Sequence, residues 1–279
     1  MIDLMTSAAS VRARVKPLRS LLRGASLLVG LLILPSAVLA YADLLPDRLD
    51  IQTLWSDAPQ AELPHVAHQL NHGEALRIVA FGSSSTEGIG ASTPAAAYPP
   101  RLEAALKRAL PQFAGQVTVL NRGIGGEHVD DMLRRLDRDV IDAKPHLVIW
   151  QTGSNDPLRG VPLDHFRAVT TAAIQRMQEA GIDVILMEPQ WCPKLDATPG
   201  AYRFRDVVRE IGDALDVPVI RRSDLMQEWI AEARLTRKEL FSADGLHMAD
   251  AGYALLARAA ADEILRDALP ETVATASAD

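Results

Sequence analysis

The sequence contains a single cysteine, Cys192, among its 279 residues. One cysteine excludes an intrachain disulfide, so stability has to come from packing. Aromatic residues are also few, at 5%, but hydrophobic residues make up 48% of the chain and no long polar tract interrupts them. This composition is typical of a folded chain, and the length suits one main domain. The absence of a repeat of fixed period disfavours solenoids and propellers.

The chain also lacks an excess of positive charge. It has 29 Lys and Arg against 36 Asp and Glu, a net charge of −7. Five of the basic residues and one acid fall within the first 40 positions, so the remainder has 24 basic and 35 acidic residues and a net charge of −11. Proteins bind nucleic acids through clusters of Lys and Arg that meet the phosphates. We therefore expect no nucleic-acid partner.

A long hydrophobic run occurs only near the N-terminus. Basic residues precede an apolar stretch at 25–34, and Pro35 and several small residues follow it. This order is typical of a secretory signal, so residues 1–40 are predicted to be a signal peptide and the protein to be periplasmic or secreted. The alternative is an uncleaved segment that anchors the protein in the membrane, facing the periplasm. Pro35 and the short apolar core favour cleavage, because a span needs about 20 apolar residues.

Short apolar runs and helical spacings alternate through the rest of the chain. Five runs are rich in Val and Ile and are bounded by Gly, Pro or polar residues, which predicts buried strands. They are LRIVAFG (76–82), VTVLNRG (117–123), LVIWQTG (147–153), DVILMEP (183–189) and VPVIRRS (217–223). Between them, apolar residues recur at spacings of three and four, which predicts helices with one buried face, the last from about 249 to 269.

This alternation predicts the fold class and the domain boundaries. Strands that alternate with helices form a parallel sheet, because parallel strands need crossovers and these are helical. We expect an α/β fold, a flavodoxin-like three-layer α/β/α sandwich with a five-stranded parallel sheet, over residues 76–270. Segment 41–75 is predicted to be an N-terminal lead-in, and residues 271–279 a C-terminal tail.

The loops after the predicted strands contain most of the reactive residue types. In open sheets of this kind, ligands bind beyond the carboxyl ends of the strands. The first four loops read FGSSSTEG, NRGIGGEH, GSNDP and PQWCP, and SADGLH follows the fifth strand and a helix. Together they supply a hydroxyl, backbone donors, an amide, an acid and an imidazole. These are the parts of an acyl-transfer site.

Ser84 is the candidate nucleophile of the first loop. A serine hydroxyl attacks an ester only when a positioned base accepts its proton. Ser84 stands at the start of the following helix, whose N-terminus favours developing negative charge. As an alternative, the hydroxyls of residues 83–86 only cap that helix. In another, the loop 82–88 holds a phosphate in a non-catalytic binding module.

Asp244 and His247 are the candidate acid and base. They are three residues apart, so on one helical turn they would share a face, with Cβ atoms about 5–6 Å apart. The carboxylate would then accept a hydrogen bond from one ring nitrogen and leave the other free to act on Ser84. At this spacing, the alternative is a local pair on a surface turn.

Several groups are candidates for stabilising the oxyanion that forms when an ester carbonyl is attacked. Fixed hydrogen-bond donors aimed at that oxygen are usually the largest single contribution to catalysis. Gly123, Gly125 and Gly126 offer backbone N–H groups, Asn155 offers a side-chain amide, and Ser84 adds its own N–H. Each also has an ordinary explanation, since glycine and asparagine are frequent in turns.

The four motifs together resemble those of the SGNH, or GDSL-like, hydrolases. FGSSSTEG resembles the nucleophile block of that family, NRGIGG its glycine block, GSND its asparagine block and DGLH its closing Asp-x-x-His. All four occur in the family's order, between residues 81 and 247. The resemblance implies Ser84 as nucleophile, Gly126 and Asn155 as oxyanion donors, His247 as base and Asp244 as its orienting acid.

The first block departs from the family at one position. Where the family commonly has Gly-Asp-Ser, this chain has Gly82, Ser83 and Ser84. The missing acid is not the catalytic one in the family, so the departure concerns the geometry of the loop more than the chemistry. The family's reaction needs no cofactor, and we expect none here.

Other candidate site residues are weighed against structural explanations. His65, His68 and His72 have helical spacing, but no acid or thiol partner is evident nearby, and a solvated helix is the better interpretation. We predict no required metal. Trp191 follows the fourth strand, where it either stacks on a sugar ring or an acyl chain of the substrate or braces its own loop. Cys192 lacks an imidazole partner once His247 is assigned, which disfavours it as a nucleophile.

The sequence therefore predicts an exported serine ester hydrolase that acts through an acyl-enzyme. The family resemblance covers esterases, lipases and lysophospholipases, thioesterases and carbohydrate acetyl esterases, so it does not choose the substrate. Export favours a carbohydrate O-acetyl esterase or a short-chain acyl esterase. The alternatives are a thioesterase or lysophospholipase-type lipid hydrolase and a glycan- or phosphate-binding module without turnover. The expected partner is a small-molecule or polysaccharide ester.

Overall fold

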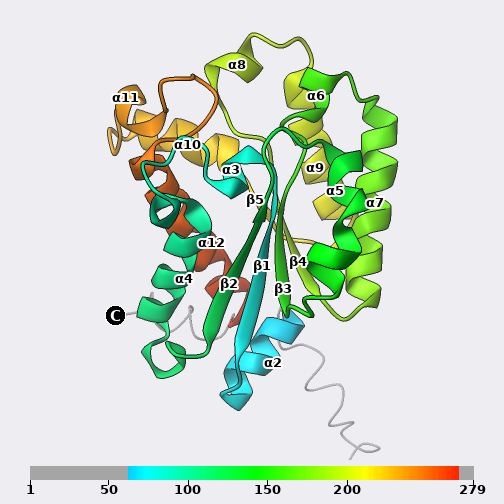
Figure 1. Ribbon diagram of the computed structural model, residues 1–279, viewed down its shortest axis with the longest axis vertical. Coiled ribbons are helices and arrows are strands. Elements are labelled where there is room, and N and C mark those ends of the chain that lie inside the picture. Colours follow the sequence, from blue (N-terminus) through cyan, green and yellow to red (C-terminus); the bar gives the residue numbers. More distant parts are fainter. Residues whose placement is uncertain (1–61, 270–279) are drawn as a thin grey trace, which may run out of the picture. The chain divides into compact units, whose positions relative to one another are not determined.

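The computed structural model describes residues 62–269, and they form the predicted α/β fold (Figure 1). Five parallel strands lie in the order β2-β1-β3-β4-β5. This is the strand order of flavodoxin-like folds. The strands are β1 (Leu76–Gly82), β2 (Val117–Gly123), β3 (Leu147–Gln151), β4 (Asp183–Met187) and β5 (Val219–Ile220). The predicted signal segment, 1–40, and the tail, 271–279, lie outside the described residues.

Helices cover both faces of the sheet because side chains alternate between its faces along each strand. Ile78 and Ala80 of β1 belong to one hydrophobic core, whereas Val79 and Phe81 belong to the other. The first core is covered by helices α2 (Pro64–His72), α4 (Tyr98–Ala109), α10 (Arg222–Ala231) and α12 (Asp250–Ala268). The second is covered by α5 (Val129–Arg134), α7 (Leu163–Glu179) and α9 (Ala201–Leu215). The three-layer sandwich is therefore confirmed.

Short helical segments occupy several of the connections. The 3₁₀ turns are Pro94–Ala96 and Pro111–Phe113, a π-helical turn spans Asp137–Ile141, and the short helices are α3 (Ser84–Glu87), α6 (Asp156–Arg159), α8 (Pro193–Asp196) and α11 (Arg237–Leu240). Helices α3, α6 and α8 lie at the end of the sheet where the strands terminate, at the top of Figure 1. Among residues 62–269, no helix has both the length and the hydropathy that a membrane span requires.

The fifth strand is much shorter than predicted. The apolar pattern predicts a strand over residues 217–223, but only Val219 and Ile220 pair with β4. Helix α10 begins at Arg222, because the buried carboxylate of Glu188 lies beside its first turn. Its Oε1 accepts a hydrogen bond from the Ser223 amide at 2.9 Å, which satisfies a free N–H of the first helical turn. The polar end of the run thus belongs to a helix.

Helix α2 lies inside the segment that the sequence suggests is a lead-in. Leu63, just before it, and Val66 within it are fully buried in the first core. The Val66 amide also donates to Asp183 Oδ2, at the start of β4, at 2.9 Å. The histidines of this helix are exposed, and the rings of His68 and His72 stack with centroids 4.1 Å apart. This part of segment 41–75 therefore packs on the sheet, while the boundary at 76 stays a prediction.

Three buried aspartates make the stability of the fold depend on pH in an unusual direction. Asp156, Asp183 and Asp267 are at most 8% exposed, and burial raises the pKa of each from 3.8 to about 6. Between these two values, the folded chain keeps the carboxyl protons that the unfolded chain releases. The stability that these groups contribute is complete below about pH 4 and is lost as the pH rises through about 6.

We expect the folded chain to be more stable at pH 5 than at pH 7. Asp156 alone adds about 1 kcal/mol to that difference, or roughly 2–4 °C in Tm. Asp139 does not oppose the trend, because hydrogen bonds from Arg138 first, and from Arg135, lower its pKa to about 2 and its contribution persists at pH 5. His146 opposes it, because burial lowers the pKa of its ring, but the three aspartates together outweigh one histidine. Calorimetry at both pH values measures the difference.

The control for this prediction is Asp156→Asn. The amide keeps an acceptor for the Val129 N–H, which Asp156 Oδ1 binds at 2.9 Å, but it removes the titration. The gain between pH 7 and pH 5 should therefore shrink by about 1 kcal/mol in this variant. A Tm for the unchanged chain that is equal or lower at pH 5 contradicts the expectation.

Candidate active site

Ser84 is the first residue of α3 and follows β1 by two positions. It is half-buried, and the helix that carries it packs closely on the end of β2. Gly123 makes this approach possible, because a Cβ at that position would lie 2.0 Å from the backbone nitrogen of Glu87. The close contact holds the loop around Ser84 (residues 82–88, the nucleophile loop) against the loop after β2 that contains Gly123, Gly125 and Gly126 (the glycine loop). Ser84 is thereby held at the carboxyl edge of the sheet, where the sequence predicts the site.

His247 connects Ser84 with Asp244. Its Nε2 lies 2.8 Å from Ser84 Oγ, although the two residues are 163 positions apart, and its Nδ1 lies 2.6 Å from Asp244 Oδ2. A carboxylate accepts only, so Nδ1 carries the proton and Nε2 is free to accept from the serine hydroxyl. His247 is 8% exposed, whereas the Asp244 side chain is 44% exposed. The structure thus brings the three predicted residues together in a linear Ser-His-Asp arrangement.

The turn between Asp244 and His247 is not helical, which corrects the geometry expected from the spacing. An antiparallel bridge between Phe241 and Met248 closes the loop, and the Ser242 amide donates to the His247 carbonyl at 2.9 Å. Gly245 adopts a left-handed φ of +65°, which ends any helical path. The acid and the imidazole still meet, because the hairpin folds Asp244 back over the following residues.

The carboxylate of Asp244 is held in its ionised form. Its Oδ1 accepts hydrogen bonds from the amides of Leu246 and His247, both at 2.9 Å, and from Ser242 Oγ at 2.7 Å. Partial burial raises its pKa, but these bonds and the one from the His247 ring outweigh burial, so the pKa falls well below the ordinary value. The negative charge therefore orients the imidazole throughout the neutral range.

The loops that carry Gly126 and Asn155 lie against each other. Asn155 Nδ2 donates to the carbonyl of Glu127, the residue after Gly126, at 2.9 Å. Gly125 adjoins the nucleophile, since a Cβ there would lie 3.8 Å from Ser84 Cβ. The loops that carry Gly125, Asn155 and the candidate nucleophile Ser84 are thus neighbours. The role of Gly126 and Asn155 as oxyanion donors stays a prediction.

Sequence reasoning missed several buried polar residues beneath the site. Gln151 Oε1 accepts hydrogen bonds from the Ser83 amide at 3.0 Å, from Ser83 Oγ at 3.1 Å and from Thr86 Oγ1 at 3.2 Å. The serine at the position of the family's usual acid is therefore a donor to this glutamine. A glutamine at the end of an otherwise apolar strand run was the one available signal, because polar groups are buried only with partners.

Arg135 is a second residue that the sequence did not indicate. It is 5% exposed and donates to the carbonyls of Gly82 and Arg122 and to the carboxylates of Glu127 and Asp139, at 2.7–2.9 Å. These bonds join the ends of β1 and β2 to the glycine loop. The guanidinium also lies over the ring of Phe81, 4.4 Å from its centroid.

The predicted substrate-binding residue, Trp191, lies beside helix α11. Its ring meets that of Phe241 edge-on with centroids 5.7 Å apart, and the guanidinium of Arg237 lies 4.8 Å from the centroid of the Trp191 ring. The ring is half-buried, so contact with a substrate stays a prediction. Cys192 is fully buried, and burial raises the pKa of its thiol, which keeps it neutral.

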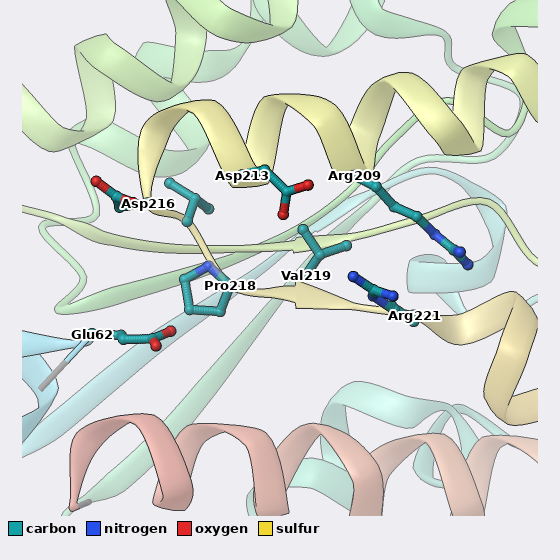
Figure 2. A pocket seen from close by; sticks show the side chains of 9 residues that line it. Glu62, Arg209, Asp213, Asp216, Pro218, Val219 and Arg221 are labelled. Carbon is teal, nitrogen blue, oxygen red and sulfur yellow. The ribbon is translucent and has the colours of Figure 1, made fainter.

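A hollow of about 580 Å³ lies elsewhere, over the edge strand β5. Figure 2 shows Arg209 and Arg221 at one end and Glu62 and Asp216 at the other. Arg209 is bound to the buried Glu188 at 2.6 Å. None of the predicted site residues lines this hollow.

Comparison with known proteins agrees with the fold and the motifs. The sequence matches the Non-GDSL lipase-like family over residues 54–269. An arylesterase of Vibrio mimicus is 26% identical over 161 residues, which cover 58% of this chain and 76% of that protein. A lipase/acylhydrolase from Enterococcus faecalis has a TM-score of 0.57 and 29% identity and covers 68% of this chain and 95% of its own.

A second similar structure is a variant of Axe2, an acetylxylan esterase from Geobacillus stearothermophilus. Its TM-score is 0.59 at 24% identity, with 68% of this chain and 94% of that chain covered, which establishes the fold alone. The resemblance drawn from the four motifs is confirmed by the family match, which spans most of the chain. The chain therefore belongs to the Non-GDSL lipase-like family and is an esterase with the fold of the SGNH hydrolases.

Proposed function

We propose that this protein is an exported serine esterase that removes short acyl groups through a covalent acyl-enzyme. The observation that carries the proposal is the 2.8 Å contact between His247 Nε2 and Ser84 Oγ, with Asp244 on the other ring nitrogen. A hydroxyl, an imidazole and a carboxylate in this order are the working parts of nucleophilic acyl transfer. The basic and then apolar order of residues 1–40 supports export.

In the proposed reaction, Ser84 Oγ attacks the ester carbonyl while His247 Nε2 takes its proton. The carbonyl oxygen becomes negative and accepts hydrogen bonds from the Ser84 amide, the Gly126 amide and the Asn155 side chain. The tetrahedral intermediate collapses, and the alcohol leaves with the proton from the imidazolium. Water then attacks the acyl-serine with His247 again as base, and the acid and the serine are released. Asp244 holds the ring and stabilises its charged form.

The substrate class that we favour is an acetylated carbohydrate. One of the proteins similar in fold acts on acetylxylan, and an exported enzyme meets polysaccharides outside the cytoplasm. Trp191 supports this choice, because a half-exposed indole ring is a suitable platform for a sugar ring. We propose that it contacts the alcohol portion of the ester.

A longer acyl chain is the second candidate, favoured by two exposed apolar side chains near the nucleophile. Ile89 and Ile124 are each 42% exposed. The Ile89 amide binds the Ser84 carbonyl at 2.9 Å, and the Ile124 amide binds the Gly82 carbonyl at 3.1 Å, so both belong to the loops around the site. Apolar residues there would pack against the methylene groups of a lipid ester.

A panel of p-nitrophenyl esters and acetylated xylo-oligosaccharides tests the proposal. We expect the acetyl ester to have the highest kcat/KM, acetate to be released from the oligosaccharides, and a fluorophosphonate to label Ser84. A maximum at eight or more carbons would reject the carbohydrate substrate in favour of a lipid ester. A chain that neither cleaves any ester nor takes the label would be a binding module, and the proposed function would be wrong.

A further inference from the structure

Four buried polar side chains form one connected network of hydrogen bonds beneath the site. They are Gln151 at the end of β3, Ser154 in the loop that follows, Gln190 after β4 and Arg222 at the start of α10. Each is at most 5% exposed. None of them transfers a proton or stabilises charge in the proposed reaction. Such a network has few ways to rearrange, because every bond that it loses leaves a buried polar group unpaired.

One end of the network holds the loop that carries Ser84. Gln151 binds Ser83 and Thr86, which lie on either side of the nucleophile, through a single oxygen atom, Oε1. Its Nε2 donates to Ser154 Oγ at 3.2 Å. Gln151 thereby joins the nucleophile loop to the loop after β3.

The other end holds the loop that carries His247. Gln190 Nε2 donates to the carbonyl of Leu246, the residue before the imidazole, at 3.3 Å. Its Oε1 accepts from Ser154 Oγ at 2.9 Å and from Arg222 Nη2 at 2.7 Å. Ser154 therefore links the two glutamines, and through them the two loops.

Arg222 fixes the orientation of the network. Its side chain is fully buried, Nη2 also lies 3.3 Å from Ser154 Oγ, and Nε donates to the Glu188 carbonyl at 3.1 Å. A guanidinium only donates and its fork is planar, so Gln190 has to present its oxygen to it and its NH₂ group to Leu246. The charge thus selects one of the two possible orientations of the Gln190 amide.

We propose that Gln151 and Gln190 are positioning residues of this esterase, and that the network joining them sets the distance between Ser84 and His247. The inference rests on the proposed function, because it concerns the geometry of that reaction. The two loops are far apart in the sequence, and the direct bonds near them are made further along the chain, from Ser92 to Asp250 at 2.6 and 2.8 Å and from Tyr253 Oη to the Ile89 carbonyl at 2.6 Å. A displacement of about 1 Å between reacting groups can cost on the order of 100-fold in rate.

Kinetics of the full-length chain test the proposal. Gln151→Met and Gln190→Met keep the length of the side chain but remove its hydrogen bonds, whereas loss of Arg222 would also remove a buried positive charge that donates to Gln190 and to the Glu188 carbonyl. Each variant should lower kcat for p-nitrophenyl acetate by about 10- to 100-fold with KM changed less than about 3-fold. The double variant should lose no more than the worse single one, since both break the same network.

Ile174→Ala is the control for simple destabilisation. Ile174 is a fully buried residue of α7 in the second core, and its truncation lowers Tm without touching the network. It should leave kcat within about 2-fold of the unchanged chain below the melting transition. An equal loss in this control, losses in the double variant that multiply, or single losses below about 3-fold would each overturn the inference.

A substrate-free measurement separates failure of this inference from failure of the proposed function. The proton that His247 Nδ1 shares with Asp244 should give a far-downfield NMR resonance. Gln190→Met should shift or broaden it, and Ile174→Ala should leave it unchanged. A resonance that is identical in Gln190→Met rejects the positioning role even if the chain hydrolyses esters. A shifted resonance supports that role even if another substrate class is found.

Discussion

Replacing Ser84 by alanine is expected to lower kcat for p-nitrophenyl acetate by about 10⁶-fold, the size of effect known for loss of a serine nucleophile. The reason is that no acyl-enzyme can form without its hydroxyl, while the oxyanion donors remain and leave a small residual rate. Protein mass after reaction with a fluorophosphonate gives an independent measure. The unchanged chain should gain one adduct, and Ser84→Ala should gain none.

The matched control for this experiment is the neighbouring serine, Ser85. It is 3% exposed and belongs to the same short helix, so Ser85→Ala perturbs the loop to a similar degree. Its kcat should stay within about 10-fold of the unchanged chain, because Ser85 has no part in the proposed reaction. If Ser85→Ala loses as much activity as Ser84→Ala and also escapes the probe, the nucleophile has been assigned to the wrong residue.

Asp244→Asn is expected to lower kcat by roughly 10⁴-fold with little change in fold. The carboxylate accepts the Nδ1 proton of His247 at 2.6 Å, whereas an asparagine amide at the same place can donate to Nδ1. The ring would then carry its proton on Nε2, which faces Ser84 and could no longer accept from the hydroxyl. Steady-state kinetics near pH 7 check the loss, and circular dichroism checks the fold.

A weaker change to the same carboxylate serves as the control. Ser242 Oγ donates to Asp244 Oδ1 at 2.7 Å, and the amides of Leu246 and His247 bind the same oxygen. Ser242→Ala therefore keeps the carboxylate and its bond to the ring, and kcat should fall less than about 10-fold. A loss below about 10-fold in Asp244→Asn would mean that the imidazole is held by other contacts, and the role proposed for Asp244 would be wrong.

The architecture could be predicted from the sequence because local patterns of apolar residues indicate most of its strands and helices. The runs 76–82 and 117–123 coincide with β1 and β2. Strand β1 is a nearly continuous apolar run because it is buried, whereas β2 lies at the edge of the sheet and only its Val117 is buried. The prediction failed at 217–223, where a local pattern could not reveal that Glu188, 35 positions before Ser223, binds the Ser223 amide. The tertiary contact overrode the strand propensity of the run.

The candidate site, too, could be predicted only in part from the sequence. That Ser84, Asp244 and His247 lie together could be predicted, because their motifs stand in fixed order along the chain. Gln151 and Gln190 could not, because neither belongs to a motif and their partners depend on how the loops pack. Apart from the bond between Gln151 and Ser154, their hydrogen bonds reach residues 32 to 68 positions away. Polar residues at the ends of apolar strands are the signal to look for in related chains.

The separation of the hydroxyl and the imidazole along the chain has a consequence for synthesis. A ribosome delivers the chain from its N-terminus, so every strand of the sheet, through Ile220, emerges before His247 does. Helix α12, which covers the first core, follows His247 in the chain. Domains begin to fold while they are being made. A nascent chain of this protein therefore has all five strands before it has His247, so the proposed triad can form only after the whole sheet has been synthesised.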